Sequence, residues 1–85
     1  MAYYLIISMI KRLTKEEKSY LKSLGARIKG LRKQRKMTQK EMAEKFGTHY
    51  TQIGRIERGD VNSTIVVLRK VASVFGIEVS EILEF

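Results

Sequence analysis

The stretch MTQKEMAEKFGTHYTQIGRIERG, residues 37–59, decides the fold, because its caps, apolar positions and glycines predict two short helices joined by a tight turn. Thr38 and Glu41 form the capping pair T-x-x-E, which places the start of the first helix at Gln39. Apolar residues then recur at helical spacing, and Gly47 stands where a left-handed residue ends a helix.

A second helix is expected directly after this turn. Thr48 is expected to cap it, so that the helix covers about residues 49–58 and is closed by Gly59. With about 100° per residue, five positions fall within about 140° on one side of this helix. They are Tyr50, Thr51, Gly54, Arg55 and Arg58. Ile53 and Ile56 fall on the opposite side and would anchor the helix.

The outward side of this second helix carries a phenol, a hydroxyl and two guanidinium groups. These donors reach phosphates or the acceptor edges of bases, and arginine with guanine is the commonest specific pair. A solvated helix face is the plainer interpretation of such a pattern. A capped helix precedes this second helix, and that arrangement favours a functional interpretation, in which the second helix lies in the major groove of DNA.

The charge also indicates a polyanionic partner. The 85 residues hold 17 Lys and Arg against 9 Asp and Glu, a net charge of +8. Residues 11–40 hold 12 basic and 2 acidic side chains, a balance of +10, whereas residues 41–85 hold 5 basic and 7 acidic ones, a balance of −2. Such a basic half attracts phosphates without regard to sequence, so specificity would have to come from the second helix.

Further landmarks flank the two helices: the basic amphipathic segment LGARIKGLRKQRKM at residues 24–37, the ending I-x-x-I-E-R-G at residues 53–59, and TIVVLRKVASVFGIEVSEIL at residues 64–83. With these, residues 21–83 resemble the lambda-repressor-like domains of phage repressors, Cro proteins and bacterial xenobiotic-response-element regulators. The resemblance implies an all-α, compact bundle of five helices that binds DNA as a dimer, with its third helix in the major groove.

The resemblance also assigns roles to single residues. Tyr50, Thr51 and Arg55 correspond to the base-reading face, although family members often carry glutamine or serine where Tyr50 stands, so the base preference does not carry over. Positions expected to contact the DNA backbone, from the resemblance and from the local charge, are Lys36, Gln39, Lys40, Thr48, His49, Arg58 and Asn62.

Two further residues match a structural pair of the family. Arg32 corresponds to a position that pairs with the acid matching Glu57, and the helical projection places Glu57 away from the DNA face. We therefore expect a partly buried Arg32–Glu57 ion pair that orients the second helix. Gly54 has two interpretations, a tolerated weakness in the helix or a missing side chain that lets the helix approach DNA closely.

The flanking segments complete the expected bundle. A first helix is predicted to begin at Thr14, where T-K-E-E offers another capping pair, and to run toward Arg35 in spite of its two glycines. Ser63 or Thr64 would cap the next helix, which ends at Gly76. The apolar positions expected in its stripe are Ile65, Leu68, Val71, Ala72 and Phe75.

The carboxy-terminal residues are unusually apolar. Ser80 is expected to cap a last turn or two that extends through Glu84. The resemblance implies a dimer contact in this region, and closing the core is the equally weighted alternative. The residues predicted for the dimer contact are Ile77, Val79, Ile82 and Phe85.

Residues 1–13 form an apolar amino-terminal extension of the domain at residues 14–85. Its run AYYLIISMI, residues 2–10, is too short to span a bilayer. Three interpretations of this run remain: a segment that packs on a partner subunit, an arm on the domain's own surface, or a start-site artefact. We favour the contact with a partner subunit.

The sequence offers no candidate for catalysis. It lacks cysteine, a glycine-rich phosphate loop, a paired-carboxylate site and a metal-spaced cluster, and His49 is its only histidine. We therefore predict no enzyme activity, no metal and no cofactor, and a reducing cytoplasmic location suits the composition. The function predicted is a dimeric regulator on an inverted-repeat operator. The alternative is an antitoxin or another protein-interaction module of the same fold, with DNA binding secondary.

Overall fold

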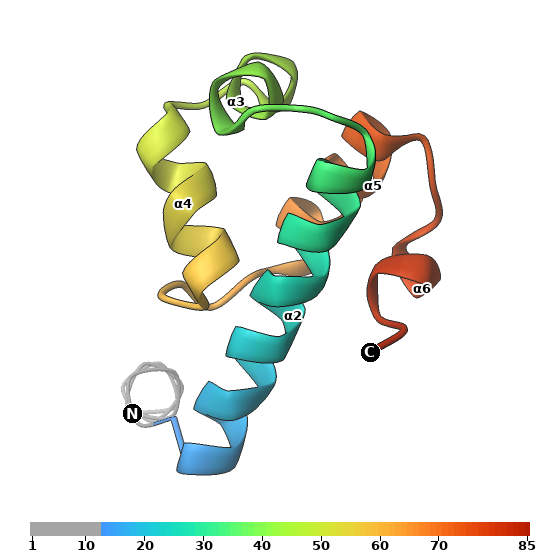
Figure 1. Cartoon of the computed structure of the whole chain (residues 1–85). Coiled ribbons are helices and arrows are strands. Elements are labelled where there is room, and N and C mark those ends of the chain that lie inside the picture. Colours follow the sequence, from blue (N-terminus) through green and yellow to red (C-terminus); the bar gives the residue numbers. More distant parts are fainter. Residues whose placement is uncertain (1–12) are drawn as a thin grey trace.

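The computed structural model describes residues 13–85, which fold into five helices and no strand (Figure 1). The helices are α2 (Lys15–Gln34), α3 (Gln39–Phe46), α4 (Tyr50–Arg58), α5 (Ile65–Phe75) and α6 (Val79–Ile82). The predicted all-α class is confirmed. The partner contact expected for residues 2–10 lies outside the described residues, and the boundary between residues 13 and 14 stays a prediction.

Side-chain caps start the helices as the sequence indicates. Thr14 and Thr38 each form a complete capping box with the glutamate three residues on, and the Thr64 hydroxyl accepts from the amide of Val67. Each cap satisfies amide groups that the first turn of a helix would otherwise leave without partners. α2 is a single helix, so its two glycines do not interrupt it.

Two predicted caps are wrong. The amide of Thr48 donates to the carbonyl of Ala43 and completes the end of α3, so α4 begins one residue later, with His49 as its cap. His49 accepts from the amide of Thr51 through its ring nitrogen Nδ1. At α6, Glu78 takes the extended cap conformation, which places Ser80 inside the first turn, and no side chain bonds to this cap.

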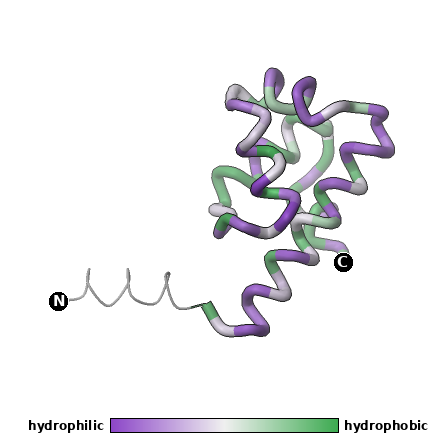
Figure 2. Tube along the Cα trace, turned by 60° about the vertical axis from the view of Figure 1, so that its left-hand side comes forward, coloured by the Kyte–Doolittle hydropathy of each residue, from purple (hydrophilic) through white to green (hydrophobic). Residues whose placement is uncertain are grey.

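One core gathers the inward faces of all five helices. Its buried apolar residues are Leu24, Ile28, Leu31, Met42, Ala43, Ile53, Ile56, Leu68, Val71, Ala72, Phe75 and Ile82. Along α2, hydrophobic residues recur every three or four positions among hydrophilic ones, as a helix with one buried face requires (Figure 2). Ile65 is the exception to the predicted stripe of α5, because 62% of its surface is exposed at the start of that helix.

The contact between α2 and α4 positions the candidate site. At Gly25 of α2, an added Cβ would lie 2.5 Å from the carbonyl oxygens of both Ile56 and Glu57. The two helix backbones can approach this closely only because Gly25 has no side chain. α2 therefore packs closely against the carboxy-terminal half of α4 (Figure 1).

Within residues 13–85, no helix is both long and apolar enough to cross a membrane.

Candidate nucleic-acid interface

Helix α4 has one buried and one exposed side. Ile53 and Ile56 are buried in the core, as the projection predicts. Tyr50 and Arg55 are exposed together with Thr51, and 43% of the Tyr50 surface is accessible. All three predicted base-reading side chains therefore lie on the solvent side of one short helix.

The start of α4 brings together two aromatic rings and one lysine. The Tyr50 ring lies 4.6 Å from the His49 ring, and the Nζ atom of Lys40 lies 5.9 Å from the Tyr50 centroid. The His49 ring also contacts the Thr51 hydroxyl at 2.9 Å. These contacts bring residues of α3 and α4 together at one edge of the exposed face.

The predicted Arg32–Glu57 ion pair is present and is buried. Arg32 Nε and Nη2 donate to the two carboxylate oxygens of Glu57 at 2.6 and 3.1 Å, and only 2% of the Glu57 side chain is exposed. Arg32 Nη1 also donates to the carbonyl of Met37 at 2.7 Å. One guanidinium group therefore ties α4 to the end of α2 and to the segment that leads into α3.

Gln39 completes this network. Its side-chain amide nitrogen donates to Glu57 Oε1 at 3.0 Å, so Gln39, a predicted phosphate contact, also holds α4. One N–H of that amide remains for an outside acceptor, because a primary amide has two. Among residues 13–85, no buried side-chain nitrogen or oxygen lacks a hydrogen-bond partner.

Gly54 lies on the side of α4 where the projection places it, but this position is not open to solvent. It is buried, and a Cβ added to it would meet Nη1 of Arg58 at 3.1 Å and the amide atoms of Gln39 at 3.8 and 3.9 Å. The interpretation as a place of close approach to DNA is therefore wrong, because side chains of α3 and α4 cover this glycine.

The other predicted backbone contacts are dispersed around this face. Lys36 is exposed and takes a positive φ of 53° at the end of α2, an unusual conformation for lysine. Thr48 is half-buried, whereas Asn62 is exposed. Arg58 is exposed and its Nε pairs with Asp60 Oδ2 at 2.9 Å. Sequence reasoning missed Asp60, although the R-x-D spacing across the turn after α4 was a signal for it.

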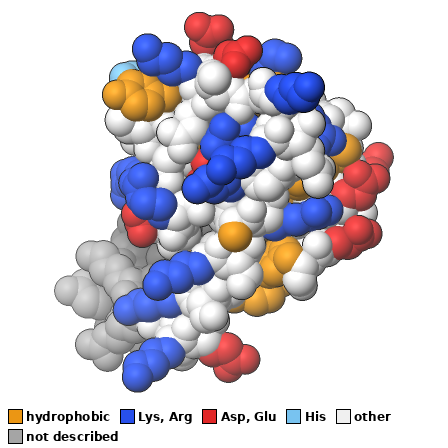
Figure 3. Space-filling view, in the orientation of Figure 1, with side chains coloured by type: hydrophobic (Ala, Val, Ile, Leu, Met, Phe, Trp, Pro, Cys, Tyr) orange, Lys and Arg blue, Asp and Glu red, His pale blue; other side chains and the backbone are white. Residues whose placement is uncertain are grey.

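The face as a whole is basic. Lys and Arg side chains gather over the side that α2, α3 and α4 present in the view of Figure 1 (Figure 3).

The amide of Thr38 donates to the Glu41 carboxylate at the start of α3 and lowers the pKa of that group. Because the pKa of Glu41 is lower in the folded state than in the unfolded state, this cap stabilises the fold at neutral pH. The stabilisation is lost as the pH falls through that lowered pKa.

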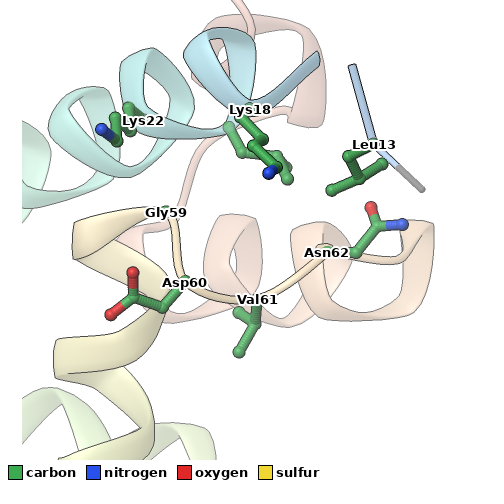
Figure 4. A pocket seen from close by; sticks show the side chains of 8 residues that line it. Leu13, Lys18, Lys22, Gly59, Asp60, Val61 and Asn62 are labelled. Atoms are coloured by element: carbon green, nitrogen blue, oxygen red, sulfur yellow. The ribbon is translucent and has the colours of Figure 1, made fainter. Parts of the chain in front are cut away.

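A cleft of about 270 Å³ lies where the start of α2 faces the loop after α4 (Figure 4). Lys18 and Lys22 come from α2, and Asp60 and Asn62 come from the loop. A Cβ added to Gly59 would meet backbone atoms of Lys22 at 2.8 Å, which makes this the second close approach of α4 to α2. Within the described residues, no group of three or more His, Asp or Glu side chains is placed to hold a metal ion.

The predicted dimer residues differ in accessibility. Ile82 is fully buried in the core of its own chain, so its assignment to a dimer contact is wrong. Ile77 and Val79 are half-buried against that core. Phe85 is 49% exposed and its ring lies 5.1 Å from the ring of Tyr20 on α2.

Comparison with known proteins agrees with this geometry. A family model described as helix-turn-helix matches residues 28–82. An immunity repressor protein of Bacillus phage phi105 is 42% identical over 60 residues, which cover 71% of this chain and 42% of the repressor. The chain therefore spans less than half the length of that relative.

Two solved structures share the fold. The restriction-modification controller protein C.AhdI from Aeromonas hydrophila has a TM-score of 0.70 at 31% identity, covering 73% of this chain and 94% of the controller. The clp gene regulator ClgR from C. glutamicum has a TM-score of 0.72 at 25% identity, covering 75% of this chain and 83% of ClgR. The chain belongs to the lambda-repressor-like, Cro/C1-type family of helix-turn-helix DNA-binding domains.

Proposed function

We propose that this chain is a sequence-specific regulator of transcription that binds double-stranded DNA with α4 in the major groove. The observation that carries the proposal is the buried network of Arg32, Gln39 and Glu57, which fixes α4 with its donor-bearing side outward. A helix held in this way binds without a further cost for ordering its backbone. The names of the phage repressor, the controller protein and the gene regulator support a role in transcription.

Two sets of side chains contact the DNA, one at the bases and one at the phosphates. Tyr50, Thr51 and Arg55 read base edges, because they are exposed on the outward side of α4. The surrounding donors and cations bind phosphates and fix the orientation of the domain on the duplex. These are Lys36, Gln39, Lys40, Thr48, His49, Arg58 and Asn62. Thr48 takes part through its half-exposed side chain, since its amide is used in the turn.

The regulator acts as a homodimer on an inverted repeat, because one short helix reads too few base pairs to select a site alone. A dimer places two recognition helices about one helical turn apart. The exposed apolar side chains of Tyr20, Leu83 and Phe85 support a contact beside α6, where the Phe85 ring lies against the Tyr20 ring in a tilted arrangement. Sedimentation equilibrium should then show a concentration-dependent dimer, and a monomer at all concentrations would contradict this assembly.

Selection from a random duplex pool at near-physiological salt tests the proposal. Enrichment of an inverted repeat with half-sites about one helical turn apart is the expected result. Retention that is sensitive to salt but enriches no sequence would contradict specific recognition. That outcome would favour the protein-interaction module, which would use its exposed apolar side chains to hold a partner.

Replacement of Lys40 with alanine should weaken binding to all DNA sequences alike. The slope of log K against log salt should become shallower by about 1 for each copy bound, because one neutralised phosphate fewer releases one counterion fewer. Fluorescence anisotropy titrations at several salt concentrations measure both quantities.

Lys45 is the matched control on the same helix, because it lies about 140° from Lys40 around the axis of α3. Lys45→Ala should leave affinity and salt slope unchanged. Equal losses for the two variants would mean that net charge, rather than the position of Lys40, governs binding.

A further inference from the structure

Two side chains meet over the glycine in the middle of α4. Gly54 is buried beneath the Arg58 guanidinium and the Gln39 amide, which come from α4 and α3. The point where a Cβ would stand lies 3.1 Å from Arg58 Nη1 and 3.8 Å from Gln39 Nε2. The two nitrogens therefore lie within about 7 Å of each other, a span that one phosphate bridges when each donor is about 2.8 Å from an oxygen.

Both groups have donors to spare in this arrangement. Asp60 accepts from Nε of Arg58 at 2.9 Å and so fixes the guanidinium by one edge. Among residues 13–85, neither terminal nitrogen of Arg58 has a hydrogen-bond partner. Gln39 uses one amide N–H on Glu57 and keeps the other. Because Glu57 is itself held by Arg32, the position of Gln39 is fixed by the same network that fixes α4.

We infer that Gly54 is a positioning residue for DNA binding: the absence of its side chain lets the Arg58 guanidinium lie against α4 beside Gln39, so that both groups bind one phosphate. The inference rests on the proposed function and assigns Gly54 a part in it. A methyl group at position 54 would lie 3.1 Å from Arg58 Nη1, which is tighter than an ordinary van der Waals contact, so the guanidinium would have to move away from α4 by a few tenths of an ångström. The end of this flexible side chain can move outward, so the fold tolerates the change, and we expect the displaced guanidinium to lose its shared phosphate contact with Gln39.

Gly54→Ala should therefore separate stability from binding. The variant should unfold at a temperature about 3–6 °C higher, because alanine is the better residue inside a helix. Its affinity for a random-sequence duplex of about two helical turns should nevertheless fall roughly fivefold to tenfold, with a salt slope shallower by about 1 for each copy bound.

Two further variants make the measurement decisive. Gly30→Ala is the matched control, since Gly30 is also inside a helix and a Cβ there meets nothing within 4 Å. It should raise the unfolding temperature similarly and leave DNA binding unchanged. Arg58→Ala should lower the salt slope by itself, and adding Gly54→Ala to it should cause no further loss, because the two changes remove one contact.

The alternatives give different results. A Gly54→Ala variant that is more stable and binds DNA as the wild type does would overturn the inference, since the glycine would then be only a weakness of the helix. An additive loss in the Arg58→Ala background would also overturn it. A wild-type domain without salt-dependent affinity for duplex DNA would instead refute the proposed function itself, and this inference with it.

Discussion

Replacement of Glu57 with alanine is expected to lower the free energy of unfolding by about 3–5 kcal/mol, because it leaves the buried Arg32 guanidinium without its counter-charge. The same change removes the acceptor of Gln39, so α4 loses its ties to α2 and α3 together. Urea denaturation followed by circular dichroism measures the loss. For a small domain, a loss of this size leaves a large unfolded fraction at 25 °C.

The exposed ion pair of Arg58 with Asp60 provides the matched control. Its two side chains are 63% and 54% exposed, so Asp60→Ala should change stability by no more than about 1 kcal/mol. If Glu57→Ala cost as little as Asp60→Ala, the buried network would not be what holds α4.

Gly25→Ala is expected to destabilise the domain by about 2–3 kcal/mol through overpacking. The added Cβ would lie 2.5 Å from two carbonyl oxygens of α4, and a helix backbone cannot move aside as a side chain can. α2 and α4 would have to separate, which would also displace the base-reading face. The same denaturation experiment, together with DNA titration of the folded fraction, measures both effects.

Gly30→Ala, in the same helix, is expected to stabilise the domain by about 0.5–1 kcal/mol, because an added Cβ there meets nothing. The opposite signs at two positions of α2 would distinguish close helix packing from helix propensity. A stabilising Gly25→Ala would show that α2 and α4 do not approach as closely as the structure indicates.

Local patterns predicted the features of this fold that are local in origin. The caps at Thr14 and Thr38 involve residues three apart, and the left-handed glycines that end α3 and α4 follow directly from the sequence. Local patterns alone could not predict the Arg32–Glu57 ion pair, because 25 residues separate its members. The resemblance to a known family predicted this ion pair, and the helical projection agreed because it placed Glu57 away from the DNA face.

Features that depend on neighbouring elements escaped prediction. The projection gives the direction of Gly54 but not that Gln39 of α3 and Arg58 cover it. Ile65 fits the apolar stripe of α5, yet it lies at the start of that helix and remains exposed. Ile82 is buried in its own core, although the sequence placed it equally well in a dimer contact.

The ratio of affinities for the selected site and for a scrambled duplex, measured for wild type and for a Tyr50→Ala, Arg55→Ala double variant, tests the central claim most directly. Both residues are exposed on α4, so the variant should unfold as the wild type does. The account predicts that the ratio falls by at least about a hundredfold while binding to the scrambled duplex changes much less, because base contacts carry specificity and phosphate contacts do not. A folded double variant that keeps the wild-type ratio would contradict the claim that α4 reads the bases.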